Sequence, residues 1–168
     1  MNQQDRTIAA LFDRLIRGEK ATQTFYLRLS EMFAHEPRAA EVWWKLAADE
    51  ASHIHLLEQA REGLTAEQLA APADPEFLRV ARNAAAHSPE EGLAQVQTLE
   101  DAYQLAHATE HTEFNAVFEV VISELFPVAV QRPFVRSQLQ EHVDRLGALE
   151  PPEWRYSVVA KRGTEGEK

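Results

Sequence analysis

The most restrictive feature of this sequence is an apolar helical stripe that a carboxylate and an imidazole interrupt. From position 43 to 64 the stripe recurs in alternating steps of three and four, as on a helix face that packs against other helices. Its members are Trp43, Leu46, Glu50, His53, Leu57, Ala60 and Leu64. Glu50 and His53 thus lie on one face, where the pattern requires Leu or Val. Because an unpaired buried carboxylate is costly, the fold must supply partners for Glu50.

Two other predicted helices carry the same kind of interruption. In the first, residues 5–35, Glu19 falls within an apolar stripe, and in the third, residues 89–126, Glu110 and Glu113 do so. The first stripe comprises Ile8, Phe12, Leu15, Glu19, Thr22, Tyr26, Leu29 and Phe33. The other comprises Val96, Leu99, Tyr103, Ala106, Glu110, Glu113, Val117 and Val120. On this pattern we interpret the two tyrosines as aromatic core, with hydrogen bonding to a carboxylate as the alternative.

The connection between the first two helices is short. Pro37 suits the first turn of a helix, and Gly63 suits the position after its end, so the second helix is predicted over residues 37–63. A short connection makes the two helices antiparallel neighbours. With a rise of about 1.5 Å per residue, Glu19 and Glu50 then come out roughly level.

A longer segment, residues 64–87, separates the second helix from the third. It is predicted to hold short helices over residues 65–70 and 74–86, and it is long enough to carry the chain from one end of a bundle to the other. Ser88 and Glu91 flank a Pro in a capping box, which marks the start of the third helix.

Two registers compete for the fourth helix, which begins between residues 128 and 134. One turns Val135, Leu139, His142, Leu146 and Leu149 inward. The other turns Phe134, Ser137, Glu141, Asp144 and Ala148 inward. The first stripe is the more apolar of the two, so we favour it, with His142 as the inward ligand and Glu141 as the alternative.

Composition limits the classes of protein that this chain can belong to. Its 168 residues suffice for one domain with a sizeable core, and few Gly or Pro interrupt it. We predict an all-α domain over residues 1–150 and a C-terminal tail over residues 151–168, after a Pro-Pro pair. The absence of Cys excludes disulfides, thiolate metal sites, iron–sulfur clusters and a catalytic cysteine.

Charge and hydropathy limit the kinds of partner that the chain can bind. A formal net charge of −10 argues against nucleic acid as a partner. No apolar run reaches the roughly 18 residues that a membrane span requires, and the first 17 residues do not resemble a secretory signal. We therefore expect no membrane association and a cytoplasmic location.

These motifs resemble those of the rubrerythrin branch of the ferritin-like superfamily. Glu19, followed seven residues later by Tyr26, is similar to the first-helix pattern of the family. Glu50-Ala51-Ser52-His53 resembles its second-helix Glu-x-x-His. Glu110-His111-Thr112-Glu113, followed by Phe118, resembles its third-helix Glu-x-x-Glu with an aromatic five residues on. The resemblance covers roughly residues 8–149.

The resemblance implies an antiparallel four-helix bundle with a long crossover between the second and third helices, and a di-iron centre. It assigns Glu50 as the bridging carboxylate, His53 and His142 as imidazole ligands of the two metals, and Glu19 and Glu110 as terminal carboxylates. It makes Glu113 a ligand that binds in one oxidation state. Zinc or manganese are the alternative metals.

The sequence departs from the family in two places. Leu139 stands where the fourth helix of the family carries its second bridging Glu, and the four-cysteine rubredoxin-like module is missing. The leading hypothesis is therefore a metal-binding, ferritin-like oxidoreductase acting on peroxide or oxygen, a homodimer or larger homo-oligomer that uses an external electron donor. The alternative is an iron-handling protein or a helical scaffold with a degenerate, non-catalytic site.

Overall fold

The computed structural model of this chain describes residues 3–86 and 89–110, and ten further positions. These are Phe118, Val121, Ser137, Gln140, Glu141, residues 144–147 and Leu149. The regular secondary structure of these residues is helical and includes no strand, which confirms the all-α prediction. The predicted tail, residues 151–168, lies outside them. No helix among the described residues combines the length and the apolar character that crossing a membrane demands.

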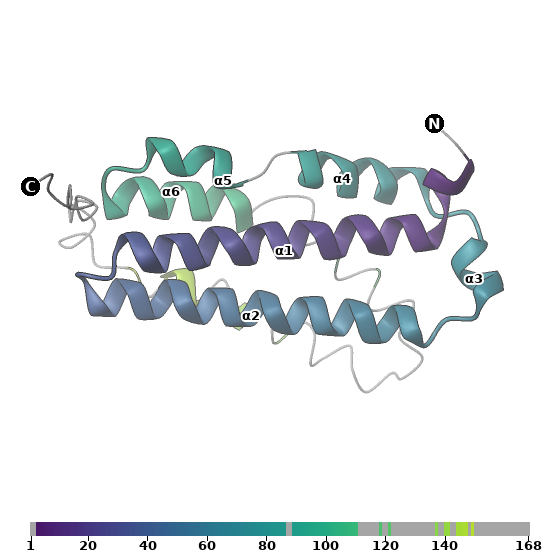
Figure 1. Ribbon diagram of the computed structural model, residues 1–168, viewed down its shortest axis with the longest axis horizontal. Coiled ribbons are helices and arrows are strands. Elements are labelled where there is room, and N and C mark those ends of the chain that lie inside the picture. Colours follow the sequence, from purple (N-terminus) through teal and green to yellow (C-terminus); the bar gives the residue numbers. More distant parts are fainter. Residues whose placement is uncertain are drawn as a thin grey trace, which may run out of the picture.

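Two long helices, α1 (Ile8–Met32) and α2 (Pro37–Glu62), run side by side and are joined by a tight turn (Figure 1). The second has the predicted bounds, with Pro37 in its first turn and Gly63 just after its end. The first is shorter than predicted at both ends. Thr7 is extended and accepts a hydrogen bond from the Ala10 N–H (3.2 Å), so the helix begins after it, behind a short 3-10 turn, η1 (Gln3–Arg6).

The segment after α2 holds two helices, as predicted. In α3 (Ala66–Ala70), Thr65 and Gln68 form a reciprocal capping box. In α4 (Pro75–Ala86), the Asp74 carboxylate accepts hydrogen bonds from the first backbone N–H groups. Figure 1 shows α4 lying along the N-terminal half of α1, whereas the later helices lie along its C-terminal half.

The prediction of one continuous third helix is wrong. The chain forms α5 (Pro89–Gly92), a 3-10 turn η2 (Leu93–Gln95), and then a separate helix, α6 (Leu99–Glu110). The new helix begins at a second capping box. The Asp101 N–H donates to Thr98 Oγ1 (3.2 Å), and Asp101 Oδ2 accepts from the Thr98 N–H (2.8 Å). Ser88 and the predicted end of this helix at residue 126 lie outside the described residues.

Helices α5 and α6 pack closely against one another at Gly92. A Cβ atom on Gly92 would lie 2.7 Å from the side chain of Leu105, so only glycine fits there without displacing that leucine. The 3-10 turn then folds the chain back, and α5 lies against α6 in Figure 1.

The buried apolar side chains of the described residues form two clusters along the α1–α2 pair. One includes Leu15, Ile16 and Ile54, toward the N-terminal end of α1. The other includes Phe25 and Ala47, toward its C-terminal end. Four buried acidic or imidazole side chains lie at the boundary between these clusters: Glu19, Glu50, His53 and Glu110. The helix stripes thus bury their polar members at one level of the fold.

Candidate metal centre

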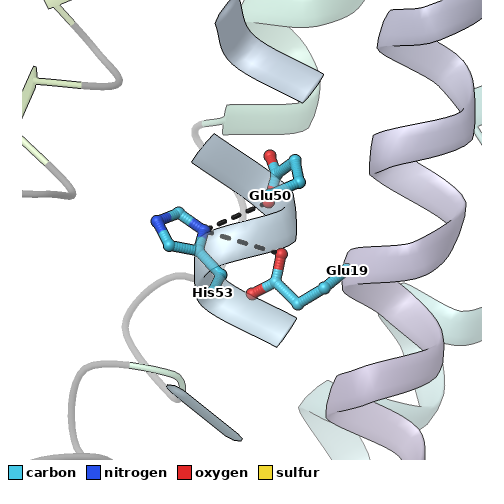
Figure 2. Close-up of side chains that lie close together, drawn as sticks. All are labelled: Glu19, Glu50 and His53. Atoms are coloured by element: carbon cyan, nitrogen blue, oxygen red, sulfur yellow. Dashed lines mark hydrogen bonds and ion pairs between the residues drawn. The ribbon is translucent and has the colours of Figure 1, made fainter. Parts of the chain in front are cut away.

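The antiparallel pairing of α1 and α2 brings three of the predicted ligands together. Glu19 projects from α1, and Glu50 and His53 project from α2, one turn apart on the face toward α1 (Figure 2). Nδ1 of His53 lies 3.1 Å from Glu50 Oε2 and 3.8 Å from Glu19 Oε2. One ligand atom from each of the three residues lies within 4.8 Å of the others.

All three side chains are withdrawn from water. Glu19 is 3% exposed, Glu50 2% and His53 3%. Two carboxylates at this depth repel one another, and each has lost its hydration, so the arrangement requires a positive charge nearby. Within the described residues, the group between them that can carry one is the His53 ring.

The burial and mutual repulsion of these groups shift the pKa values of Glu50 and His53. Burial raises the pKa of Glu50 well above its usual value, and the negative charge of Glu19 adds to the rise; hydrogen bonding with His53 opposes it. Burial by itself lowers the pKa of His53, but its hydrogen bonds and attraction to Glu19 and Glu50 outweigh burial and raise that pKa well above its usual value. The raised pKa of His53 favours the imidazolium form, in which both ring nitrogens carry protons, and this ring supplies positive charge beside the two carboxylates.

A divalent cation can take the place of that proton. The group offers two carboxylate oxygens and one imidazole nitrogen, a donor set that suits iron, zinc or manganese. Binding would release protons and relieve the repulsion between Glu19 and Glu50. The donor atoms are already gathered from two helices, so little rearrangement is needed.

Glu110 lies beside this group and is held by Tyr26. The Tyr26 hydroxyl donates a hydrogen bond to Glu110 Oε1 across 84 sequence positions. Burial first, and then the negative charges of Glu110, Glu50 and Glu19, raise the pKa of Tyr26 well above its usual value. Tyr26 therefore stays neutral and keeps its proton for Glu110. The interpretation of this tyrosine as plain aromatic core misses that role, although its ring does stack on Trp43.

The remaining predicted ligands are Glu113, His142 and, as the alternative on the fourth helix, Glu141. Glu113 and His142 lie outside the described residues. Glu141, the alternative ligand on the fourth helix, has a side chain 52% exposed that faces Arg145 at 3.6 Å. Leu146 and Leu149 are buried, whereas Asp144 is exposed, as the favoured register of that helix requires.

Two further residues make contacts next to the group: Asp49, which no sequence pattern singles out, and Phe118, the aromatic residue that follows Glu113 by five positions. Asp49, next to Glu50 but on another side of α2, binds Arg145 at 2.9 Å and so ties α2 to the chain around residues 144–147. Burial raises the pKa of Asp49, and the charge of Arg145 partly opposes this. The ring of Phe118 packs on the His53 ring, with centroids 5.0 Å apart. Both contacts join residues far apart in the chain, which no local pattern predicts.

Comparison of the chain with protein-family models, with curated proteins and with solved structures gives no match in any of the three. The geometry and chemistry of the group itself are therefore the observations that bear on function.

Proposed function

We infer that this chain is a metal-binding protein of ferritin-like, rubrerythrin-related character, whose ion is held by Glu19, Glu50 and His53. One observation carries the inference. Three buried groups that each favour a cation, from two helices, place their ligand atoms within 4.8 Å of one another. A buried site of this composition is unfavourable when empty and favourable when a divalent ion neutralises it.

The proposal extends to the fold. An antiparallel four-helix bundle would use α1, α2, the helix containing α6 and the chain from residue 137 to 149 as its four members, with α3 to α5 in the crossover. Support comes from the buried Leu146 and Leu149, which belong to the same apolar cluster as Phe25 and Leu99. In such a bundle, carboxylates from facing helices meet at one level, as Glu19, Glu50 and Glu110 do.

Iron is the metal that we propose, with Glu110 as a further ligand once it leaves Tyr26. Carboxylate-rich sites with imidazole suit iron, and bound iron would supply the electron transfer that reduction of peroxide or oxygen requires. The residues of the chain would bind the ion and exclude water, and Tyr26 would hold a proton beside Glu110. The proposed protein is cytoplasmic, a homodimer or larger homo-oligomer, and draws on an external electron donor.

A second candidate, metal handling without turnover, is favoured by the fourth helix. Glu141 is at the surface and Leu139 replaces the carboxylate that the resemblance requires, so a second metal position would be short of a bridging ligand. This candidate predicts one tightly bound ion per chain and a weak or absent second. Iron-loaded protein that does not consume peroxide would favour it over the oxidoreductase.

Elemental analysis tests the proposal. Protein purified without chelator should contain about one iron, zinc or manganese ion per chain, because the three ligands form one well-made position. Glu50→Gln and His53→Ala should each remove it. Glu58→Gln is a matched control, since Glu58 lies on the same helix but is half-buried and faces Lys20. If the control loses as much metal as the site variants do, the ion is bound elsewhere and the proposal fails.

A further inference from the structure

A pocket of about 410 Å³ opens between the start of α1 and α4, where four arginines gather. Arg6, Arg14, Arg79 and Arg82 line it, together with the side chain of Leu78 and two prolines. The chain has only 17 Lys and Arg residues against 27 Asp and Glu. Four guanidinium groups around one pocket therefore form a local positive region on an acidic protein.

The positive charge of the pocket is only partly neutralised. Arg79 forms two hydrogen bonds with the carboxylate of Glu76, at 2.9 and 2.5 Å. Arg14 instead donates to the backbone carbonyl of Asp5 at 3.0 Å, which orients the guanidinium and leaves its charge in place. Of these guanidinium groups, that of Arg79 thus faces a carboxylate, whereas the carbonyl that Arg14 contacts does not neutralise its charge.

Backbone pairing holds together two of the segments that line the pocket, one around Arg6 and one around Pro72 and Ala73. The Ala73 N–H donates to the carbonyl of Arg6 (2.9 Å), and the Ile8 N–H donates to the carbonyl of Ala71 (3.0 Å). Thr7 and Pro72 form an isolated antiparallel bridge between these bonds. The backbone of these two segments is thus fixed before any ligand binds, which lowers the entropy cost of binding.

We propose that this pocket binds a small organic anion, a phosphate or carboxylate group attached to a short apolar body. Guanidinium groups bind both oxyanions through paired hydrogen bonds. Leu78 and the prolines offer an apolar wall for the rest of the ligand, and the volume is within the roughly 300–1,000 Å³ of small-molecule sites. Arg14 and Glu19 lie about 140° apart around α1, so the pocket opens on a different face from the metal centre.

Calorimetric titration of the full chain with phenyl phosphate tests this proposal. The double variant Arg6→Gln/Arg14→Gln should bind about tenfold more weakly or worse, because two charged donors are lost. The control Arg17→Gln/Arg28→Gln removes the same net charge from α1 at positions outside the pocket, and it should bind as the unaltered chain does. Thermal melting followed by circular dichroism checks that both variants fold. Arg82→Gln, at the exposed rim, gives a second test that does not disturb η1.

Three results would overturn the proposal. The first is folded protein that shows no saturable binding of phenyl phosphate in the millimolar range. The second is an equal loss of affinity in the two double variants, which would show a general field effect. The third is inorganic phosphate binding as tightly as phenyl phosphate, which would show that the apolar part of the ligand contributes nothing to the affinity. Since these arginines lie outside the metal centre, metal content should be the same in all the variants, whatever the outcome.

Discussion

At the scale of single residues, the centre depends on how each buried charge finds a counterpart. Glu19 and Glu50 share the His53 ring as their counterpart, and Glu110 has the hydroxyl of Tyr26. Each partner lies on a helix stripe that a purely apolar core would fill with Leu or Phe. Loss of one partner leaves a buried carboxylate with fewer donors, which costs more than the hydrogen bond itself contributes.

Tyr26→Phe tests whether the Tyr26 hydroxyl stabilises the buried Glu110 carboxylate. The change removes the donor to Glu110 and keeps the ring that stacks on Trp43, so packing should be preserved. We expect the free energy of unfolding to fall by about 1–3 kcal/mol in urea denaturation. An unchanged free energy of unfolding would show that the Tyr26 hydroxyl does not stabilise Glu110.

At the scale of elements, the sequence predicts those helices whose ends carry local chemistry. Pro37, Gly63, Thr65 and Asp74 mark their boundaries correctly because caps and turns act within a few residues. The break between α5 and α6 was missed, although Thr98 and Asp101 form a capping box that is visible in the sequence. The apolar stripe continues through the break and conceals it, since Val96 and Leu99 are buried on both sides.

Thr98→Ala tests whether this second cap defines the start of α6. Loss of the hydroxyl leaves the Asp101 N–H without its acceptor, and we expect the free energy of unfolding to fall by about 0.5–2 kcal/mol. Thr24→Ala is the control, because its hydroxyl only donates to the Lys20 carbonyl within an exposed turn of α1. A continuous helix through residue 98 would make the two variants alike.

The centre shows the same division between local and distant information. The stripes single out Glu19, Glu50, His53 and Glu110, and the structure buries all four. Their spacing on each helix is local, and the short turn before Pro37 determines which carboxylates become level. The Asp49–Arg145 and His53–Phe118 contacts depend on how distant segments pack, and the spacing of residues along one helix does not predict which partner each side chain meets.

At the scale of the whole molecule, the centre should make stability depend on pH. The folded pKa values of Glu50 and His53 are both raised, so the folded chain holds more protons than the unfolded chain above pH 4.5 and, for His53, above 6.5. Stability of metal-free protein should therefore fall as pH rises through this range and beyond.

Thermal melts of chelator-treated protein from pH 5 to 8 measure this slope. Glu50→Gln, which cannot ionise, should flatten the curve by about 1 kcal/mol or more relative to the unaltered chain. Excess divalent metal should reverse the trend, since the ligands must lose their protons to bind it. Parallel curves for the variant and the unaltered chain would show that the pKa of Glu50 is the same in the folded and unfolded states.

Anomalous X-ray scattering from metal-loaded crystals can show whether a metal ion lies between Glu19, Glu50 and His53, as we propose. We predict one strong peak per chain, about 2.0–2.2 Å from an imidazole nitrogen of His53 and from a carboxylate oxygen of each glutamate. The peak should disappear in crystals of Glu50→Gln. An anomalous map of the metal-loaded chain with no peak between these three side chains, or with its strongest peak elsewhere, would contradict the account.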